Sequence, residues 1–121
     1  MPPATTGQQA EQMAKDYLLA QGLVFHSANF RARQGEIDLI FKDQKTWVFI
    51  EVKNRKNDRF GSAVEWVTAS KQRKIIHTAK QFCATHQLPT QSDIRFDVIG
   101  ITNLNPHSIT WVKHAFISDE S

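Results

Sequence analysis

The sequence has 121 residues, enough for one domain that buries a core without disulfides or structural metals. Hydrophobic residues make up 40% of it and charged residues 22%, as in ordinary soluble domains, and no apolar run approaches the ~20 residues of a membrane span. One cysteine, Cys83, excludes an internal disulfide. Because the N-terminus also lacks the apolar segment of a secretory signal, we expect a cytoplasmic protein.

The net charge of +3 is unevenly distributed along the chain. Residues 31–80 contain 12 of the 15 lysines and arginines but 6 of the 12 acidic residues. A polyanion-binding face would produce such an excess, because phosphate contacts supply most of the nonspecific affinity for nucleic acid. A solvated surface with a chance excess of lysine would produce it equally well.

Hydrophobic periodicity and turn residues predict seven elements. We expect a helix over 8–21, strands over 23–27, 36–42 and 47–53, a helix over 68–86, and strands over 94–101 and 109–116. Residues 43–46 are predicted to form a four-residue hairpin loop, and 54–61 a polar, basic loop. This order indicates an α/β fold with a mixed sheet flanked by helices. We expect one domain over 7–117, with flexible termini at 1–6 and 118–121.

Asp38, Glu51 and Lys53 are the residues that indicate chemistry. Glu51 directly follows the apolar run 47–50, and Asp38 lies between two apolar residues. Strands this apolar are usually buried, and carboxylates rarely occur in them unless they are paired or bind a cation.

Strand geometry brings these residues together. Side chains alternate between faces, so Glu51 and Lys53 share a face, and a four-residue loop would pair Lys42 with Trp47 and place Asp38 opposite Glu51. Such opposed carboxylates, with Cβ atoms roughly 4.5–5.5 Å apart, would suit Mg²⁺, and Lys53 could stabilise charge on a phosphate. The alternative is a cross-strand salt bridge between Lys53 and one of the carboxylates.

The motifs around these residues resemble a known nuclease superfamily. They are 35–40 (GEIDLI), 49–53 (FIEVK) with Arg55, 60–61 (FG), Asn29 with Arg31, and 95–98 (RFDV). From Gly7 to Phe116 the sequence resembles the PD-(D/E)xK nucleases, and more closely the YraN-like family of bacterial proteins, which is similar to archaeal Holliday junction resolvases.

The resemblance implies a restriction-endonuclease-like core and a role for each site residue. Asp38 and Glu51 would be ligands of Mg²⁺ or Mn²⁺, with the Val52 carbonyl as a possible third, and Lys53 would be the catalytic lysine. Glu11 would match the helix-one glutamate that completes the resolvase site. The glycine that usually precedes this glutamate is Ala10 here.

The resemblance also implies a metal-dependent endonuclease that cleaves DNA, with branched or junction DNA favoured. A homodimer would suit a four-way junction, and no membrane partner is expected. The predicted nucleic-acid contacts are Arg31, Arg33, Arg55, Lys56, Arg59, Lys71, Gln72 and Lys74. The alternative is a non-catalytic nucleic-acid-binding module in which the carboxylates and lysine are structural.

Several other reactive residue types are predicted to be structural. The five histidines show no metal-ligand spacing. Cys83 lies in an apolar helical stripe and is expected to be a buried small hydrophobe, and the three tryptophans are expected in the core. Asp97, on an apolar strand, is expected to form a structural salt bridge.

Overall fold

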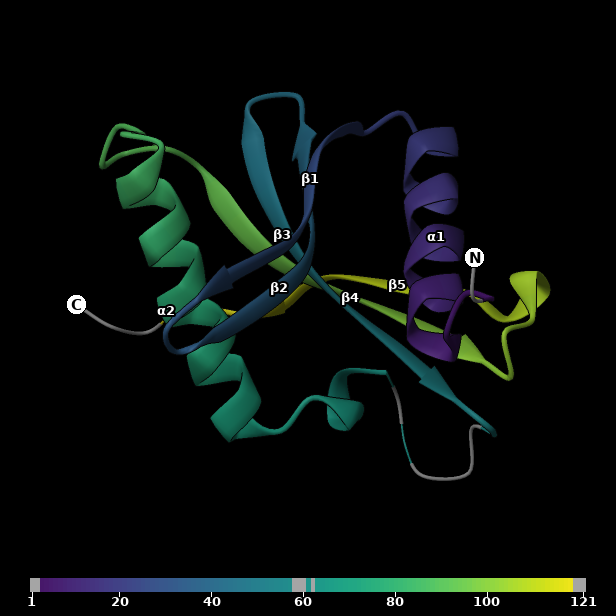
Figure 1. The fold of residues 1–121 in the computed structure, drawn as a ribbon. Helices are drawn as coiled ribbons and strands as arrows, with labels where there is room; N and C mark the ends of the chain where they lie inside the picture. The colour runs from purple at the N-terminus through teal and green to yellow at the C-terminus, as the bar shows by residue number, and fades with distance from the viewer. Residues whose placement is uncertain (1–2, 58–60, 62, 119–121) are drawn as a thin grey trace.

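The computed structural model describes residues 3–57, 61 and 63–118 (Figure 1). Its elements are α1 (Thr6–Ala20), β1 (Val24–Ala32), β2 (Gly35–Asp43), β3 (Thr46–Arg55), the 3-10 helix η1 (Val64–Trp66), α2 (Ala69–Thr85), β4 (Ile94–Thr102), the 3-10 helix η2 (Pro106–Ser108) and β5 (Thr110–Phe116). The α/β order matches the prediction and is consistent with a restriction-endonuclease-like core. Within these described ranges, no helix has the length and apolar character needed to cross a bilayer.

Both α-helices begin after a threonine that caps the first turn. The Thr5 hydroxyl accepts the N–H of Gln8, whose side chain accepts the N–H of Thr5, so the two residues form a capping box. The Thr68 hydroxyl accepts the N–H of Lys71 at the start of α2. The capping box explains why α1 begins at Thr6, inside the segment that the sequence predicts to be flexible.

The five strands lie in the sheet in their sequence order. β3 and β4 run parallel, while each of the other neighbouring pairs is antiparallel. Lys42 pairs with Trp47 as predicted, but the pairing continues to Asp43 and Thr46, so the turn is shorter than the predicted four-residue loop. Gln44, with φ of 56°, lets the chain reverse in this shorter turn.

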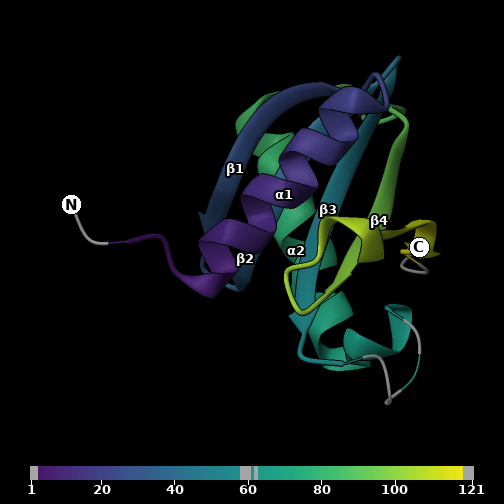
Figure 2. The same ribbon diagram turned by 90° about the vertical axis from the view of Figure 1, so that its right-hand side faces the viewer.

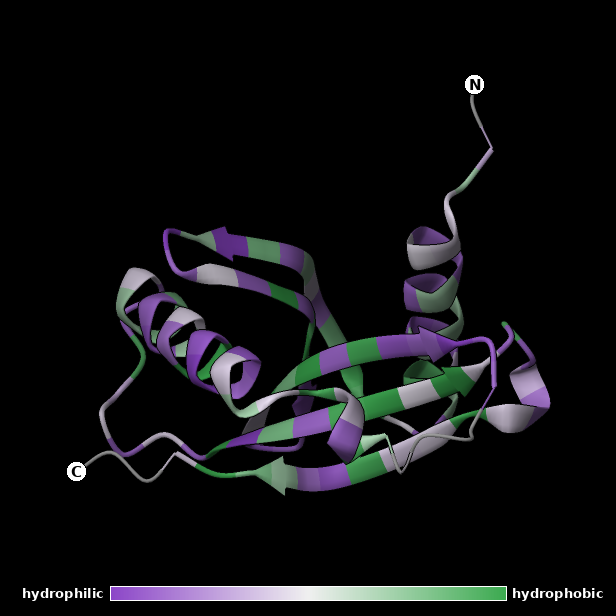
Figure 3. Ribbon diagram, turned by 90° about the horizontal axis from the view of Figure 1, so that it is seen from below, coloured by the Kyte–Doolittle hydropathy of each residue, from purple (hydrophilic) through white to green (hydrophobic). Residues whose placement is uncertain are grey.

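The two helices cover opposite faces of the sheet (Figures 1 and 2). α1 packs on a core that includes Phe41 and Ile50, whereas α2 packs on a core that includes Phe49 and Phe82. Hydrophobic and hydrophilic segments alternate along the strands in Figure 3. Because both faces of the central strands are covered, β3 can be apolar at consecutive positions before Glu51.

β1 and β3 are both longer than predicted. β1 runs to Ala32, and its second half contains Asn29 with φ of 55°, so it lacks the apolar alternation on which the prediction depended. Pairing of Ala32 with Gly35 holds this part of the strand instead. β3 runs to Arg55, because its pairing with β4 continues into the segment predicted to be a loop. The tip of the β1–β2 hairpin lies against α2 (Figure 1), where a Cβ on Gly35 would be 3.4 Å from the Thr78 hydroxyl.

A buried ion pair within β4 connects this strand to β5 and to the end of β2. Asp97 is fully buried and accepts hydrogen bonds from Arg95 Nε at 3.1 Å and from Trp111 Nε1 at 2.9 Å. It also accepts the N–H of His114 at 3.1 Å. Arg95 Nη1 in turn lies 2.8 Å from Asp43 Oδ2, at the end of β2. The structural salt bridge predicted for Asp97 is therefore confirmed.

Candidate active site

The candidate site lies where β2 and β3 separate. The pairing of these strands is regular up to Leu39 opposite Ile50. Beyond that pair a side chain replaces the main-chain acceptor, because Asp38 Oδ2 accepts the N–H of Val52 at 2.8 Å. Asp38 and Glu51 thus occupy neighbouring antiparallel strands at the point where β2 turns toward α2 and β3 stays beside β4 (Figure 1).

Glu51 is held between two lysines. Its side chain is 4% exposed, and its Oε1 lies 3.8 Å from Lys53 Nζ and 3.5 Å from Lys71 Nζ. Lys53 is two positions further along β3, so it shares the face of Glu51 as the alternation of strand side chains requires. Lys71 comes from the first turn of α2 and was predicted only as a phosphate contact. Its place beside Glu51 depends on how α2 packs on the sheet, which spacing in the sequence does not reveal.

Burial raises the pKa of both carboxyl groups. For Asp38 burial is the largest cause, and the hydrogen bond from the Val52 N–H opposes it. For Glu51, burial and then the charge of Asp38 raise the pKa from 4.5 to about 7, although Lys71 and Lys53 lower it. Two carboxylates so close in a buried site favour a bound cation, because its charge offsets both their mutual repulsion and their loss of hydration.

The raised pKa of Glu51 predicts that Glu51→Gln stabilises the metal-free protein in alkaline solution. Unfolded Glu51 ionises near its ordinary pKa, whereas the folded group ionises at about 7, so its ionisation opposes folding. This cost is absent at low pH, grows between the two pKa values and is complete above 7. At about pH 8 with a chelator we expect Glu51→Gln to add roughly 1–3 kcal/mol to the free energy of unfolding.

Thermal unfolding of both proteins at several pH values would measure this difference. At about pH 4 the two should have nearly equal stability, because Glu51 is then protonated in the folded chains and in most of the unfolded chains. A less stable Gln variant at about pH 8 would contradict the prediction, since it would mean that pairing with Lys53 and Lys71 outweighs burial.

Glu11 lies at the edge of this site, on α1. It lines a shallow pocket with Asn29 and Lys15. Burial, followed by the charge of Asp38, raises its pKa, so the two carboxyl groups are near enough to interact. Across residues 3–57, 61 and 63–118, no three His, Cys, Asp or Glu side chains are grouped so as to hold a metal. Glu11 is therefore not gathered with Asp38 and Glu51, and its role in the site stays a prediction.

Oxygen atoms of Asp38, Glu51 and Val52 suit a hard divalent cation. Mg²⁺ binds oxygen ligands and keeps several waters, so one or two carboxylates and a carbonyl are a sufficient protein contribution. Asp38 uses Oδ2 for the Val52 N–H, and its Oδ1 makes no hydrogen bond within the described part of the chain. Lys71 is 44% exposed on a flexible stem, so it can move away from Glu51 when a cation enters.

Six of the eight predicted nucleic-acid contacts fall into two groups. Four of them line one cleft between the β1–β2 hairpin and α2, namely Arg31, Arg33, Lys71 and Lys74. Arg55 and Lys56 lie at the end of β3, with the Arg55 guanidinium 5.6 Å from the centre of the Trp66 ring. Gln72 donates to the Val67 carbonyl, which fixes the start of α2. Arg59 lies outside the described residues.

The residues predicted to be structural occupy core or core-edge positions. Trp47 and Trp66 pack against the core under α2, and Trp111 packs against the core under α1. Cys83 is half-buried in the core under α2, and burial raises the pKa of its thiol. A thiol with a raised pKa is a poor nucleophile, so Cys83 fits the predicted packing role.

Comparison with known proteins identifies similar sequences over most of the chain. A sequence model of the uncharacterised protein family UPF0102 matches residues 10–101. A UPF0102 protein of Vibrio parahaemolyticus is 48% identical over 109 residues, covering 90% of this chain and 89% of the relative. A UPF0102 protein of Coxiella burnetii is 47% identical over 109 residues, with the same coverage of 90% and 89%. A UPF0102 protein of Nitrosococcus oceani is 42% identical over 120 residues, covering 96% and 97%.

Proposed function

The chain belongs to the uncharacterised protein family UPF0102. From the site itself, we propose that it is a metal-dependent endonuclease that cleaves DNA. The observation that carries the proposal is the pair of half-buried Asp38 and buried Glu51, with Lys53 and Lys71 beside it. Two anions can hold a divalent cation, and two adjacent ammonium groups can face a phosphate. Branched DNA is the favoured substrate, by the resemblance to junction resolvases.

Each residue of the site has a distinct role in this proposal. Asp38 and Glu51 hold the cation through carboxylate oxygens, with the Val52 carbonyl as a third donor. A Mg²⁺ ion held there would act as a Lewis acid toward a phosphate oxygen and would make water a better nucleophile. Lys53, 28% exposed on the face of Glu51, stabilises negative charge that develops on the phosphate. The Lys71 ammonium group moves away from Glu51 and contacts a neighbouring phosphate oxygen.

A nucleic-acid-binding module without catalysis is the second candidate function. The observation that favours it is that Glu51 is paired with Lys53 and Lys71, and that Asp38 accepts the Val52 N–H. The cluster is thus balanced without a metal, as a structural salt bridge would be. Such a module would bind DNA equally well with a divalent cation or with a chelator, and would cut none.

A cleavage panel separates the two candidates. Single-stranded, duplex, flap and four-way DNA would each be incubated with the protein and Mg²⁺, Mn²⁺ or a chelator. We expect cleavage of at least one branched substrate with Mg²⁺ or Mn²⁺ and none with the chelator. Binding of every substrate without cleavage under any condition would favour the binding module.

The basic end of β3 predicts a contribution to duplex binding. Changing Arg55 and Lys56 together to alanine should remove two phosphate contacts, at about 0.9 released counterions each. The slope of log K against log salt for a blunt duplex should therefore decrease in magnitude by about 1.8. Binding would be measured by fluorescence anisotropy across a salt series. An unchanged slope would show that these residues do not contact phosphate.

The proposal extends to assembly and location. A four-way junction presents two equivalent strands, so a homodimer would place one site on each of them. Sedimentation of the protein with and without junction DNA tests this point, and a one-to-one complex would contradict it. A DNA substrate places the protein in the cytoplasm.

A further inference from the structure

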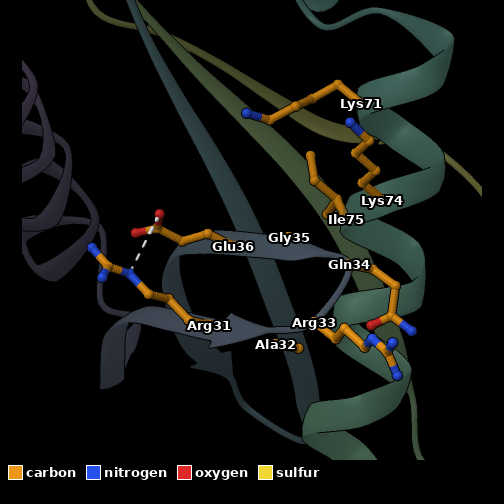
Figure 4. A pocket seen from close by; sticks show the side chains of 9 residues that line it. All are labelled: Arg31, Ala32, Arg33, Gln34, Gly35, Glu36, Lys71, Lys74 and Ile75. Atoms are coloured by element: carbon orange, nitrogen blue, oxygen red, sulfur yellow. Dashed lines mark ion pairs between the residues drawn. The ribbon is translucent and has the colours of Figure 1, made fainter.

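A basic cleft lies next to the candidate active site, between the tip of the β1–β2 hairpin and α2 (Figure 4). It is a cavity of about 440 Å³, and its basic lining residues are Arg31, Arg33, Lys71 and Lys74. Lys71 belongs to both places, because its side chain lines the cleft and its Nζ lies 3.5 Å from Glu51 Oε1. The cleft therefore adjoins the site where cleavage is proposed.

The charges of the cleft favour an anion. Glu36 is its acidic lining residue, and Arg31 Nε lies 3.7 Å from Glu36 Oε2, so these two charges offset each other (Figure 4). Within the described ranges, Arg33 and Lys74 make no ion pair with a carboxylate. Two cations from different elements thus face one cavity with no protein anion to neutralise them, which is the arrangement that binds phosphate.

The walls of the cleft are fixed relative to each other. Gly35 brings the hairpin tip close to α2, because a Cβ there would be 3.5 Å from Lys74 Cβ and 3.4 Å from the Thr78 hydroxyl. The Thr78 hydroxyl also donates to the Lys74 carbonyl at 2.7 Å. Close packing of this kind holds the backbones that carry Arg33 and Lys74 at a set separation, so the walls of the cleft are in place before a ligand enters.

The size and lining of the cleft distinguish between kinds of nucleic acid. Cavities of about 300–1,000 Å³ enclose single small ligands, so 440 Å³ accommodates about one nucleotide. A cavity of this volume cannot enclose a base-paired duplex. The lining contains no aromatic side chain on which a base could stack, and its apolar contribution comes from Ala32, Gly35 and Ile75. Recognition would therefore depend on the backbone rather than on the bases.

We propose that this cleft holds the sugar–phosphate backbone of a single DNA strand that leads away from the scissile phosphate. The proposal rests on the proposed nuclease function and specifies its substrate, which must have a single-stranded segment next to the point of cleavage. Arg33 and Lys74 contact consecutive phosphates of that strand, and Lys71 lies between the cleft and the cation site. Binding there is independent of base sequence.

Binding measurements in a chelator test the cleft without requiring catalysis. The DNA probes are a single strand, a blunt duplex, and the same duplex with a single-stranded tail. The test variant combines Arg33→Ala with Lys74→Ala. Its control combines Lys45→Ala with Arg73→Ala, which removes the same charges from exposed positions outside the cleft.

The test variant should bind the tailed duplex and the single strand at least about tenfold more weakly than the unmodified protein does. For the single strand, its slope of log K against log salt should decrease in magnitude by about 1.4. Its affinity for the blunt duplex should match that of the control. Equal losses on blunt and tailed duplex, or no loss on either, would overturn the proposal. Cleavage by the unmodified protein is scored separately. Cleavage without a preference for tailed DNA would refute only the proposed role of the cleft. A preference for tailed DNA without any cleavage would refute only the proposed nuclease function.

Discussion

Replacing Asp38 with asparagine should lower the rate of DNA cleavage at least about a thousandfold, which corresponds to about 4 kcal/mol of lost transition-state stabilisation. Asparagine keeps the shape of the side chain, and its carbonyl oxygen can still accept the Val52 N–H, so β2 and β3 should stay in place. The amide carries no negative charge, and a hard divalent cation loses one of its two carboxylate ligands.

DNA affinity should survive the change and even increase, because one carboxylate fewer repels phosphate. Asp16→Asn is the matched control, since Asp16 is an exposed carboxylate on α1 whose side chain accepts from Gln12. Cleavage rates under single-turnover conditions and affinities in a chelator would be measured for both variants. Equal cleavage by Asp38→Asn and the unmodified protein would mean that Asp38 holds no metal.

Replacing Asp97 with alanine should lower the free energy of unfolding by about 3–5 kcal/mol. The change leaves the buried Arg95 without the partner of its Nε, and it leaves Trp111 Nε1 and the N–H of His114 without their acceptor. Removing one member of a buried ion pair costs more than the pair contributes, because the remaining charge stays buried, and Arg95 would keep only its contact with Asp43.

Urea denaturation followed by circular dichroism would measure this loss. Asp93→Ala is the control, because Asp93 is exposed and contributes its backbone carbonyl to the Trp47 N–H rather than its side chain. The control should stay within about 0.5 kcal/mol of the unmodified protein. If Asp97→Ala unfolded at the same urea concentration as the control, the ion pair would not hold β4 and β5 together.

The fold was predictable where local patterns are strong. The apolar periodicity of α2 and the apolar runs of β2 and β3 identified those elements, and the predicted pairing of Lys42 with Trp47 was correct even though the turn was shorter. The second half of β1 was missed, because Asn29 adopts a positive φ and interrupts the alternation. That part of the strand is formed by its pairing with β2, which is a tertiary effect.

The part of the candidate site that lies on the β2–β3 hairpin was predictable from the sequence. The hairpin register places Asp38 beside Glu51, and strand alternation places Lys53 on the face of Glu51. The position of Lys71 was not predictable, because it depends on where α2 crosses the sheet. The same crossing, together with the close approach at Gly35, forms the basic cleft from residues far apart in the sequence.

Lys53→Ala separates catalysis from metal binding when both are measured on the same protein. We expect the unmodified protein to cut branched DNA with Mn²⁺, and Lys53→Ala to cut it at least about a thousandfold more slowly. We also expect Mn²⁺ to raise the unfolding temperature of both proteins to a similar extent, because Lys53 acts on the phosphate while Asp38 and Glu51 hold the ion. Cleavage by neither protein, or equal cleavage by both, would contradict these expectations.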